Sequence, residues 1–447
     1  MLMYAKKSRT GLIILLSCLC ILFAGLGWYL FDTNVDRSGW VEKEGIYSYR
    51  DFHGRKVTGW QDIDGRRYYF TEEKIMATDW LEQEGHTYYL GDDGAMDIGW
   101  FSVGQDRYYS NPQGILQTGW QDIDFQRYYL GQDGILQTGW LEQEGSTYYL
   151  GEDGAMAMGL VQIEADTYYF TAEGTMHTGS LNLDEQLYFF AEDGTMHTGW
   201  LDTEDGTQYY TPETGHLVTG WQEIEDSRYY FSEEGIMHTG WLEQGEYRYY
   251  LHPDGTAAHG PTDIDGTTYY FSPKGIHVVL VNAQVKVPDY YEMELVNIQG
   301  WHRVSSVCLE PLQKMLADCE AAGIQYTFNS AYRSLSEQRD ILDSRTAEYV
   351  SQGYNDTAAY MKARQTVALP GTSEHHLGLA VDLLGVDAQK WLGEHCWEYG
   401  FILRYTAEKE AITGFVDEPW HFRYVGTEIS LDMKDSGLCL EEYLGAA

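Results

Sequence analysis

Gly235-Ile236-Met237-His238-Thr239-Gly240-Trp241 is one copy of a pattern that recurs about every twenty residues between residues 39 and 275. A tyrosine pair such as Tyr229-Tyr230 follows the tryptophan by eight or nine residues, and polar segments such as Asp62-Ile63-Asp64-Gly65 separate the aromatic clusters. Short aromatic segments joined by a polar turn are typical of β-hairpins. Each unit is therefore predicted to be a hairpin plus a connection.

The repeats number twelve, with one single-residue insertion before Gly220. Eight copies keep the Gly-Trp pair, at Gly39-Trp40, Gly59-Trp60, Gly99-Trp100, Gly119-Trp120, Gly139-Trp140, Gly199-Trp200, Gly220-Trp221 and Gly240-Trp241. Degenerate copies stand at Asp79-Trp80, Gly159-Leu160, Gly179-Ser180 and Gly260-Pro261. One hairpin cannot bury its own aromatic side chains, whereas stacked hairpins can. We therefore predict a β-hairpin repeat solenoid over residues 37–277.

Length and charge limit the class of protein. A chain of 447 residues is too long for one ordinary core and predicts two or three domains. It has 29 Lys and Arg against 69 Asp and Glu, a formal net charge of −40. Nucleic-acid binding depends on clustered basic residues, so this composition argues against a nucleic-acid partner.

The first 36 residues differ from the rest of the chain. Basic residues precede an uncharged run over residues 11–31, and Asp32 and Asp36 follow it. A helix of that length spans a bilayer, and the basic flank predicts a cytoplasmic N-terminus. We predict a cytoplasmic basic tip and a transmembrane signal anchor over residues 1–36, with the remaining domains extracytoplasmic. A cleaved signal peptide is the alternative, and Leu15-Leu16-Ser17-Cys18 loosely resembles a lipoprotein box.

The twenty-residue period stops after Gly275, and residues 278–447 predict a compact α+β domain. Apolar residues from Leu309 to Cys319 fall at helical spacing, and Gly323 ends that run. Other patterns predict a strand over 324–330, helices over 336–350 and 356–367, a buried strand over 379–384, a helix that Asp387 caps and that ends at Gly400, and a final strand over 421–425.

Two segments of this domain contain residues suited to a metal site. They are Ser373-Glu374-His375-His376-Leu377-Gly378-Leu379-Ala380-Val381-Asp382 and Glu418-Pro419-Trp420-His421. A catalytic zinc site uses three nitrogen or oxygen ligands and keeps one position open. His375, Asp382 and His421 supply such a set. Glu418, three residues before a ligand, would act as the base that takes a proton from water.

Together these segments resemble the signature of VanY-type zinc D,D-carboxypeptidases, Ser-x-His-x-x-Gly-x-Ala-x-Asp with a later Glu-Pro-Trp-His. Every fixed position is matched, and the likeness extends to residues 329–334 and 400–405. The resemblance implies Zn²⁺ bound by His375, Asp382 and His421, with Glu418 as the catalytic base. It also implies that the substrate contacts Arg333, Gln338, Ser373 and Tyr405. A fixed cation such as Arg333 can hold a terminal carboxylate or an oxyanion.

The repeats resemble the cell-wall-binding repeats of the choline-binding and glucan-binding type, in which aromatic side chains of adjacent units form cages for choline. The residue that precedes the tyrosine pair, which is aromatic in that family, is Arg67, Thr87, Arg107, Arg127, Thr147 or Arg228 in this chain. Each cage would lack one wall. We therefore expect the repeats to bind a wall polymer or glycan, rather than choline specifically.

The resemblances and the predicted compartment indicate a membrane-anchored zinc metallopeptidase of the bacterial cell surface. It would remove the C-terminal D-alanine from peptidoglycan stem peptides and be targeted to the wall by its repeats. Two alternatives stay open, namely an L,D-carboxypeptidase that acts on tetrapeptides and a non-catalytic wall-binding scaffold or adhesin.

Four cysteines lie outside the predicted anchor, at Cys308, Cys319, Cys396 and Cys439. An oxidising compartment could pair them in three ways, or they could be unpaired buried thiols. Cys308 and Cys319 would stand three turns apart on one helix, too far to bond to each other.

Overall fold

The computed structural model describes residues 37–447, so the predicted anchor over residues 11–31 lies outside the described residues. In the described part, no helix is long and apolar enough to cross a membrane. The chain divides into two compact units between His197 and Thr198. The first unit contains repeats, and the second contains the last repeats and the α+β domain.

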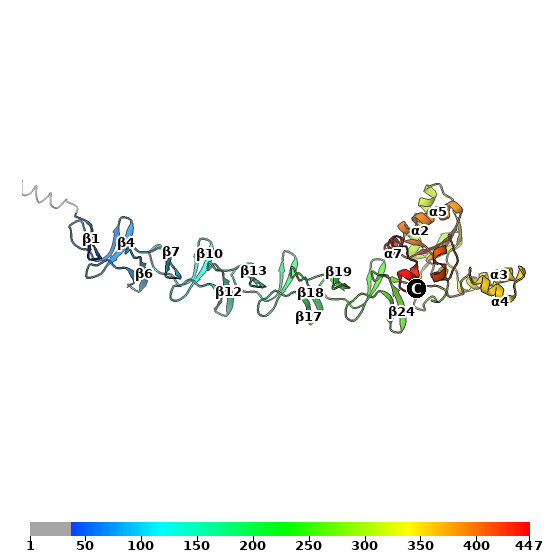
Figure 1. The fold of residues 1–447 in the computed structure, drawn as a ribbon, viewed down its shortest axis with the longest axis horizontal. Coiled ribbons are helices and arrows are strands. Elements are labelled where there is room, and N and C mark those ends of the chain that lie inside the picture. The colour runs from blue at the N-terminus through cyan, green and yellow to red at the C-terminus, as the bar shows by residue number, and fades with distance from the viewer. Residues whose placement is uncertain (1–36) are drawn as a thin grey trace, which may run out of the picture. The chain divides into compact units, whose positions relative to one another are not determined.

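The repeats form twelve antiparallel hairpins, as predicted (Figure 1). Their strands are β1 (Gly39–Lys43), β2 (Ile46–Arg50), β3 (Gly59–Ile63), β4 (Arg66–Phe70), β5 (Asp79–Gln83), β6 (His86–Leu90), β7 (Gly99–Val103), β8 (Asp106–Ser110), β9 (Gly119–Ile123), β10 (Gln126–Leu130), β11 (Gly139–Gln143), β12 (Ser146–Leu150), β13 (Gly159–Ile163), β14 (Asp166–Phe170), β15 (Gly179–Leu183), β16 (Gln186–Phe190), β17 (Gly199–Thr203), β18 (Gly206–Tyr210), β19 (Gly220–Ile224), β20 (Ser227–Phe231), β21 (Gly240–Gln244), β22 (Tyr247–Leu251), β23 (Gly260–Ile264) and β24 (Thr267–Phe271).

A two-residue turn sets the register of each typical hairpin. Between β3 and β4, Asp64 and Gly65 have φ angles of 50° and 78°. Positive φ at both turn positions matches the twist of paired strands, which explains the polar-glycine turn. The resulting register places Trp60 directly opposite Tyr69, so the aromatic pair of the sequence pattern becomes a cross-strand pair.

Successive repeats are joined through backbone and side-chain contacts. The amide of Leu136, in the connection between β10 and β11, donates to the carbonyl of Arg107 on β8 at 2.8 Å. The Leu136 side chain in turn lies against Gly154 of the next connection, where an added Cβ would come within 2.7 Å of it. Fully buried side chains such as Leu130 and Leu150 line the interior. Stacking therefore builds a core that no single hairpin possesses.

The second unit continues with a four-stranded antiparallel sheet in the order β28-β29-β31-β30, as an α+β domain requires. Its elements are β25 (His277–Val278), β26 (Leu295–Gln299), β27 (His302–Ser305), α2 (Ser306–Ala321), β28 (Thr327–Ser330), α3 (Leu335–Ser351), α4 (Asp356–Ala363), η1 (Glu374–Leu377), β29 (Ala380–Leu384), α5 (Val386–His395), η2 (Cys396–Tyr399), β30 (Phe401–Leu403), η3 (Ala407–Lys409), α6 (Glu410–Thr413), β31 (His421–Tyr424), α7 (Thr427–Ser436) and α8 (Leu440–Tyr443).

One predicted helix start is wrong. The N-cap position of α5 is Gly385, with φ of 129°, and Asp387 lies inside the first turn. The chain leaves β29 directly into α5, and glycine allows that change of direction without an Asp cap. The predicted end of the helix at Gly400 is correct if α5 and η2 are taken together. The helix η2 follows α5 directly and ends at Tyr399, and Gly400 after it has φ of 80°. Helices α7 and α8 follow the strand that was predicted to be the last.

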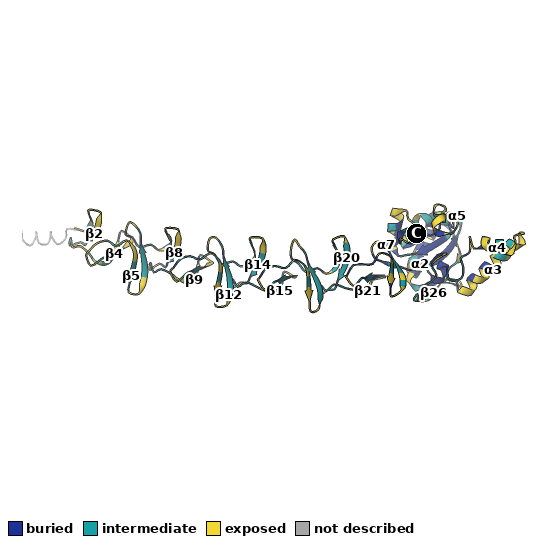
Figure 2. Cartoon of the chain, turned by 60° about the horizontal axis from the view of Figure 1, so that its bottom comes forward, coloured by how far each residue is buried: buried dark blue, intermediate teal, exposed yellow. Residues whose placement is uncertain are grey.

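The α+β domain has its own apolar core, seen as dark blue ribbon in Figure 2. It packs α2 and α5 against the sheet through residues such as Leu312, Leu383 and Phe422. The four cysteines of this domain are unpaired and buried. Burial raises the pKa of Cys308 and Cys396 to about 12, so these two thiols stay protonated and act as small apolar side chains.

A second core is shared between the last repeats and the α+β domain. Tyr249 and Leu251 of one hairpin and Ile276 after the final hairpin pack with buried residues of the domain. Those partners are Ile402, Ile429, Met433, Leu440, Tyr443 and Leu444. The last hairpins are therefore part of the structural support of the α+β domain.

Candidate metal centre

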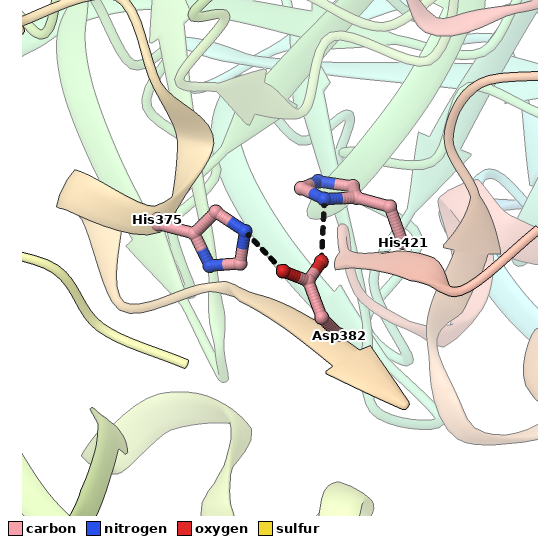
Figure 3. A group of neighbouring side chains, drawn as sticks. All are labelled: His375, Asp382 and His421. Carbon is pink, nitrogen blue, oxygen red and sulfur yellow. Dashed lines mark hydrogen bonds and ion pairs between the residues drawn. The ribbon is translucent and has the colours of Figure 1, made fainter. Parts of the chain in front are cut away.

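Strand register brings together the three predicted metal ligands. Asp382 on β29 lies directly opposite His421 on β31. His375 lies on η1, which ends at Gly378 with φ of 68° and so turns the chain into β29. The candidate ligand atoms of the three residues lie within 4.8 Å of one another, and all three residues are buried (Figure 3).

His375 has the tautomer that a metal ligand needs. Its Nδ1 lies 2.6 Å from the carbonyl oxygen of Ala331, which can only accept, so Nδ1 carries the proton. Nε2 therefore keeps its lone pair and faces Asp382 Oδ2 at 3.3 Å. Burial lowers the pKa of His375 to about 4. This imidazole is neutral at physiological pH, as metal binding requires.

His421 is held between two carboxylates. Its Nδ1 lies 3.0 Å from Asp382 Oδ1, and its Nε2 lies 3.3 Å from Glu374 Oε2. Burial by itself would lower the pKa of His421, but the hydrogen bonds to Asp382 and Glu374 outweigh it and raise the pKa to about 9. Since Nδ1 faces Asp382, a metal would bind at Nδ1 in place of its proton, while Glu374 orients the ring through Nε2.

Glu374 belongs to a buried network of charges. Its Oε1 accepts from Arg404 Nε at 2.8 Å and from Arg423 Nη1 at 3.1 Å. Arg404 also donates to both oxygens of Glu441 on α8, at 2.9 and 2.5 Å. Burial would raise the pKa of Glu374, but the two guanidinium groups hold it below its ordinary value. Two arginines thus balance two buried carboxylates, and the network ties the metal centre to the C-terminal helix.

Arg333 lies at the centre of the site. Its Nη2 donates to Asp382 Oδ2 at 2.7 Å and lies 2.9 Å from His375 Nε2. These two atoms are also candidate metal ligands, and they cannot serve a guanidinium donor and a metal through the same lone pairs. The donor set of two imidazoles and one carboxylate fits zinc.

The other predicted substrate residues surround this centre. Gln338 is buried, accepts from Arg333 Nη1 at 3.1 Å and donates to the carbonyl of Ala368 at 2.8 Å, so its amide positions the guanidinium. Ser373 Oγ accepts from the amide of His375 at 3.4 Å and caps η1. Tyr405 is buried with its ring centroid 5.0 Å from that of His421.

Glu418 lies beside the three candidate ligands. Its Oε2 is 3.8 Å from His421 Nδ1. Burial raises the pKa of Glu418 to about 7, although His421 beside it pulls the pKa down. A carboxylate whose pKa lies near neutrality can accept a proton from water and later return it, which is the behaviour of a general base.

The site opens into a cleft of about 760 Å³. Its lining includes the three candidate ligands together with Arg333, Gln338, Ser373, Tyr405 and Glu418. All the residues that the sequence analysis selected thus share one cavity. Sequence reasoning missed the supporting residues Glu374, Arg404 and Glu441. The charged Glu374 inside the motif was a signal, because a buried carboxylate needs charged or hydrogen-bonding partners. Its partners Arg404 and His421 lie 30 or more residues away in the chain, so the sequence pattern did not identify them.

Comparisons with known proteins match both parts of the chain. Residues 301–427 match the family model of VanY, D-alanyl-D-alanine carboxypeptidase. Residues 57–101, 117–159 and 218–259 match the choline-binding repeat.

Among curated relatives, a D-alanyl-D-alanine carboxypeptidase of Enterococcus faecalis is 40% identical over 174 residues, covering 37% of this chain and 65% of the relative. The putative carboxypeptidase YodJ of Bacillus subtilis is 32% identical over 204 residues, covering 40% of this chain and 71% of the relative. The chain thus spans about two thirds of the length of these relatives. Among solved structures, a mutant of the vancomycin resistance D,D-pentapeptidase VanY in complex with Zn(II) is 40% identical, covering 37% of this chain and 97% of that one, with a TM-score of 0.36.

Proposed function

Because the chain belongs to the VanY family of D-alanyl-D-alanine carboxypeptidases, we propose that it removes the C-terminal D-alanine from peptidoglycan stem peptides with the help of Zn²⁺. The convergence of His375, Asp382 and His421 in one buried cluster, with Glu418 beside them, is the observation that carries the proposal. The three ligands would hold the ion. A bound zinc supplies Lewis-acid polarisation of the peptide carbonyl and a more acidic water.

The protein's own residues would then divide the remaining work. Glu418 accepts a proton from the attacking water and delivers it to the departing D-alanine amine. Arg333 offers a guanidinium for the terminal carboxylate or for the oxyanion that forms at the carbonyl. Gln338 keeps that guanidinium at the cleft wall, since its amide accepts from Arg333.

The test is product analysis with the full chain, purified in detergent and loaded with zinc. A pentapeptide that ends in D-Ala-D-Ala is expected to release D-alanine, measured with a D-amino-acid oxidase assay, and a chelator is expected to abolish the release. Cleavage of a tetrapeptide only would favour the L,D-carboxypeptidase. Stoichiometric zinc without turnover on either peptide would favour the scaffold function.

The remaining parts of the chain would set its location. The apolar run over residues 11–31 would anchor the protein in the cytoplasmic membrane as a single span, with residues 37–447 on the outside. The repeats would hold the enzyme close to a wall polymer or glycan. Membrane fractionation combined with protease digestion of intact cells tests this orientation, because only an external domain is degraded.

A further inference from the structure

Most repeats that keep the tryptophan fall into two structural classes that differ at one position. In five repeats the residue seven positions after the tryptophan is arginine, and its guanidinium carbon lies over the indole ring, 3.8–5.1 Å from the centroid. These pairs are Arg67 on Trp60, Arg107 on Trp100, Arg127 on Trp120, Arg228 on Trp221 and Arg248 on Trp241. In the repeats of Trp80, Trp140 and Trp200 the same position is Thr87, Thr147 or Thr207, and in the repeat of Trp40 it is Tyr47.

In both classes the indole packs against two tyrosines in the same way. Trp60 packs edge-on against Tyr69 and Tyr88, at centroid distances of 5.3 and 4.9 Å. Trp80 packs in the same way against Tyr89 and Tyr108, at 5.0 Å each, and Phe101 in addition stacks on both of these tyrosines at 5.2 and 5.5 Å. The aromatic frame therefore does not distinguish the classes, and the difference lies in what covers the indole face.

A cross-strand carboxylate accompanies most of these positions. Asp62 lies 3.8 Å from Arg67, and Asp122 lies 3.6 Å from Arg127. In the repeat of Trp80 the corresponding acid, Glu82, is instead hydrogen-bonded by the uncharged Thr87 at 2.6 Å. An arginine repeat thus holds its own cation over the indole, beside a cross-strand acid at Arg67, Arg127 and Arg248 but opposite Ser102 at Arg107. The threonine repeat of Trp80 keeps the acid and the indole without that cation.

Exposure of the indoles follows the same division. The tryptophans Trp80, Trp140 and Trp200 are exposed, at 38%, 46% and 39% of their surface, as is Trp40 at 41%, whereas the five tryptophans under an arginine are less exposed. A quaternary ammonium ligand is attracted by an open aromatic face and a nearby carboxylate. At an arginine repeat the ligand would have to displace the guanidinium and then stay beside a like charge.

We propose that the residue seven positions after the repeat tryptophan decides whether that repeat can take a quaternary ammonium group of a wall polymer. Arginine closes the five repeats named above, and threonine, as in the repeats of Trp80 and Trp140, leaves the indole without that cation. The inference rests on the proposed wall-binding role of the repeats and makes Thr87, Thr147 and the five arginines determinants of ligand specificity.

The test exchanges the two residue types in the full chain and counts bound choline by equilibrium dialysis. The double variant Thr87→Arg/Thr147→Arg is expected to lose about two equivalents of choline, and Arg67→Thr/Arg127→Thr is expected to gain about two. Thr87→Gln/Thr147→Gln, which adds length without charge, is the matched control and should keep the wild-type value. All four positions are on strand surfaces, so circular dichroism should show unchanged folding.

Two results would overturn the inference, namely no choline bound to the wild-type chain at tens of millimolar ligand, or equal binding by the wild type and the Thr→Arg variant. Sedimentation with purified sacculi is measured in parallel. If the wild-type chain sediments with sacculi but binds no choline, the proposed wall-binding role stands and only the proposed rule of ligand specificity is contradicted. D-Alanine release from a soluble peptide should stay unchanged in every variant.

Discussion

At the scale of single residues, the proposed chemistry depends on Glu418. Glu418→Gln keeps the size of the side chain but cannot accept a proton, so kcat is expected to fall about 10²–10⁴-fold. Zinc content, measured by atomic emission, should stay at the wild-type level because Glu418 is not one of the three clustered ligands. An unimpaired rate would remove Glu418 from the role of general base.

Glu374 is expected to matter for metal affinity, although it is not a candidate ligand. Glu374→Gln would weaken the hydrogen bond that orients His421 through Nε2, and loss of such outer partners weakens metal binding about 10–100-fold. Competition with a chromogenic chelator measures the affinity. Glu408→Gln, at an exposed position, is the matched control. Equal zinc affinity in both variants would contradict the role given to Glu374.

At the scale of secondary-structure elements, the connections between hairpins control stacking. Gly154 has φ of 83°, and an added Cβ would lie 2.7 Å from Leu136. Gly154→Ala is expected to destabilise the repeats by about 2–4 kcal/mol, from left-handed strain plus overpacking.

Gly139→Ala provides the comparison for this substitution. Gly139 has φ of 79° with nothing within 4 Å of an added Cβ, so only the strain of about 1–2 kcal/mol applies. Urea unfolding followed by tryptophan fluorescence measures both variants. Equal shifts of the two midpoints would show that the Leu136 contact does not tighten the stack.

Turn and cap residues predicted most helices and strands correctly. Contacts between segments that are far apart in the sequence were not predicted. The turn at Asp64-Gly65 and the stop at Gly400 follow from backbone preferences that a few neighbouring residues determine. The predicted cap at Asp387 failed because the path of the chain out of β29 required a glycine at position 385. Helices α7 and α8 were not predicted, although α8 carries Glu441 of the buried charge network.

At the scale of the whole molecule, the shared core predicts that the last repeats support the enzyme. A fragment of residues 278–447 lacks Tyr249, Leu251 and Ile276, which pack against the α+β domain. Each buried apolar side chain of this size contributes about 1.5–3 kcal/mol. Residues 198–447 are therefore expected to unfold at a clearly higher temperature than residues 278–447 in calorimetry. Identical melting temperatures would show that the shared core adds no stability.

The amino-acid sequence by itself determined the hairpin repeat and selected the residues of the candidate metal centre. Turn glycines, paired aromatics and the two motifs act over short stretches, where local sterics and side-chain chemistry decide the outcome. Only the tertiary structure decided which charges support that chemistry. The bonds between Glu374, Arg404 and Glu441, and the arginines over the repeat tryptophans, depend on strand register and chain path. Those long-range contacts arise when distant segments pack together, and no short stretch of sequence encodes them alone.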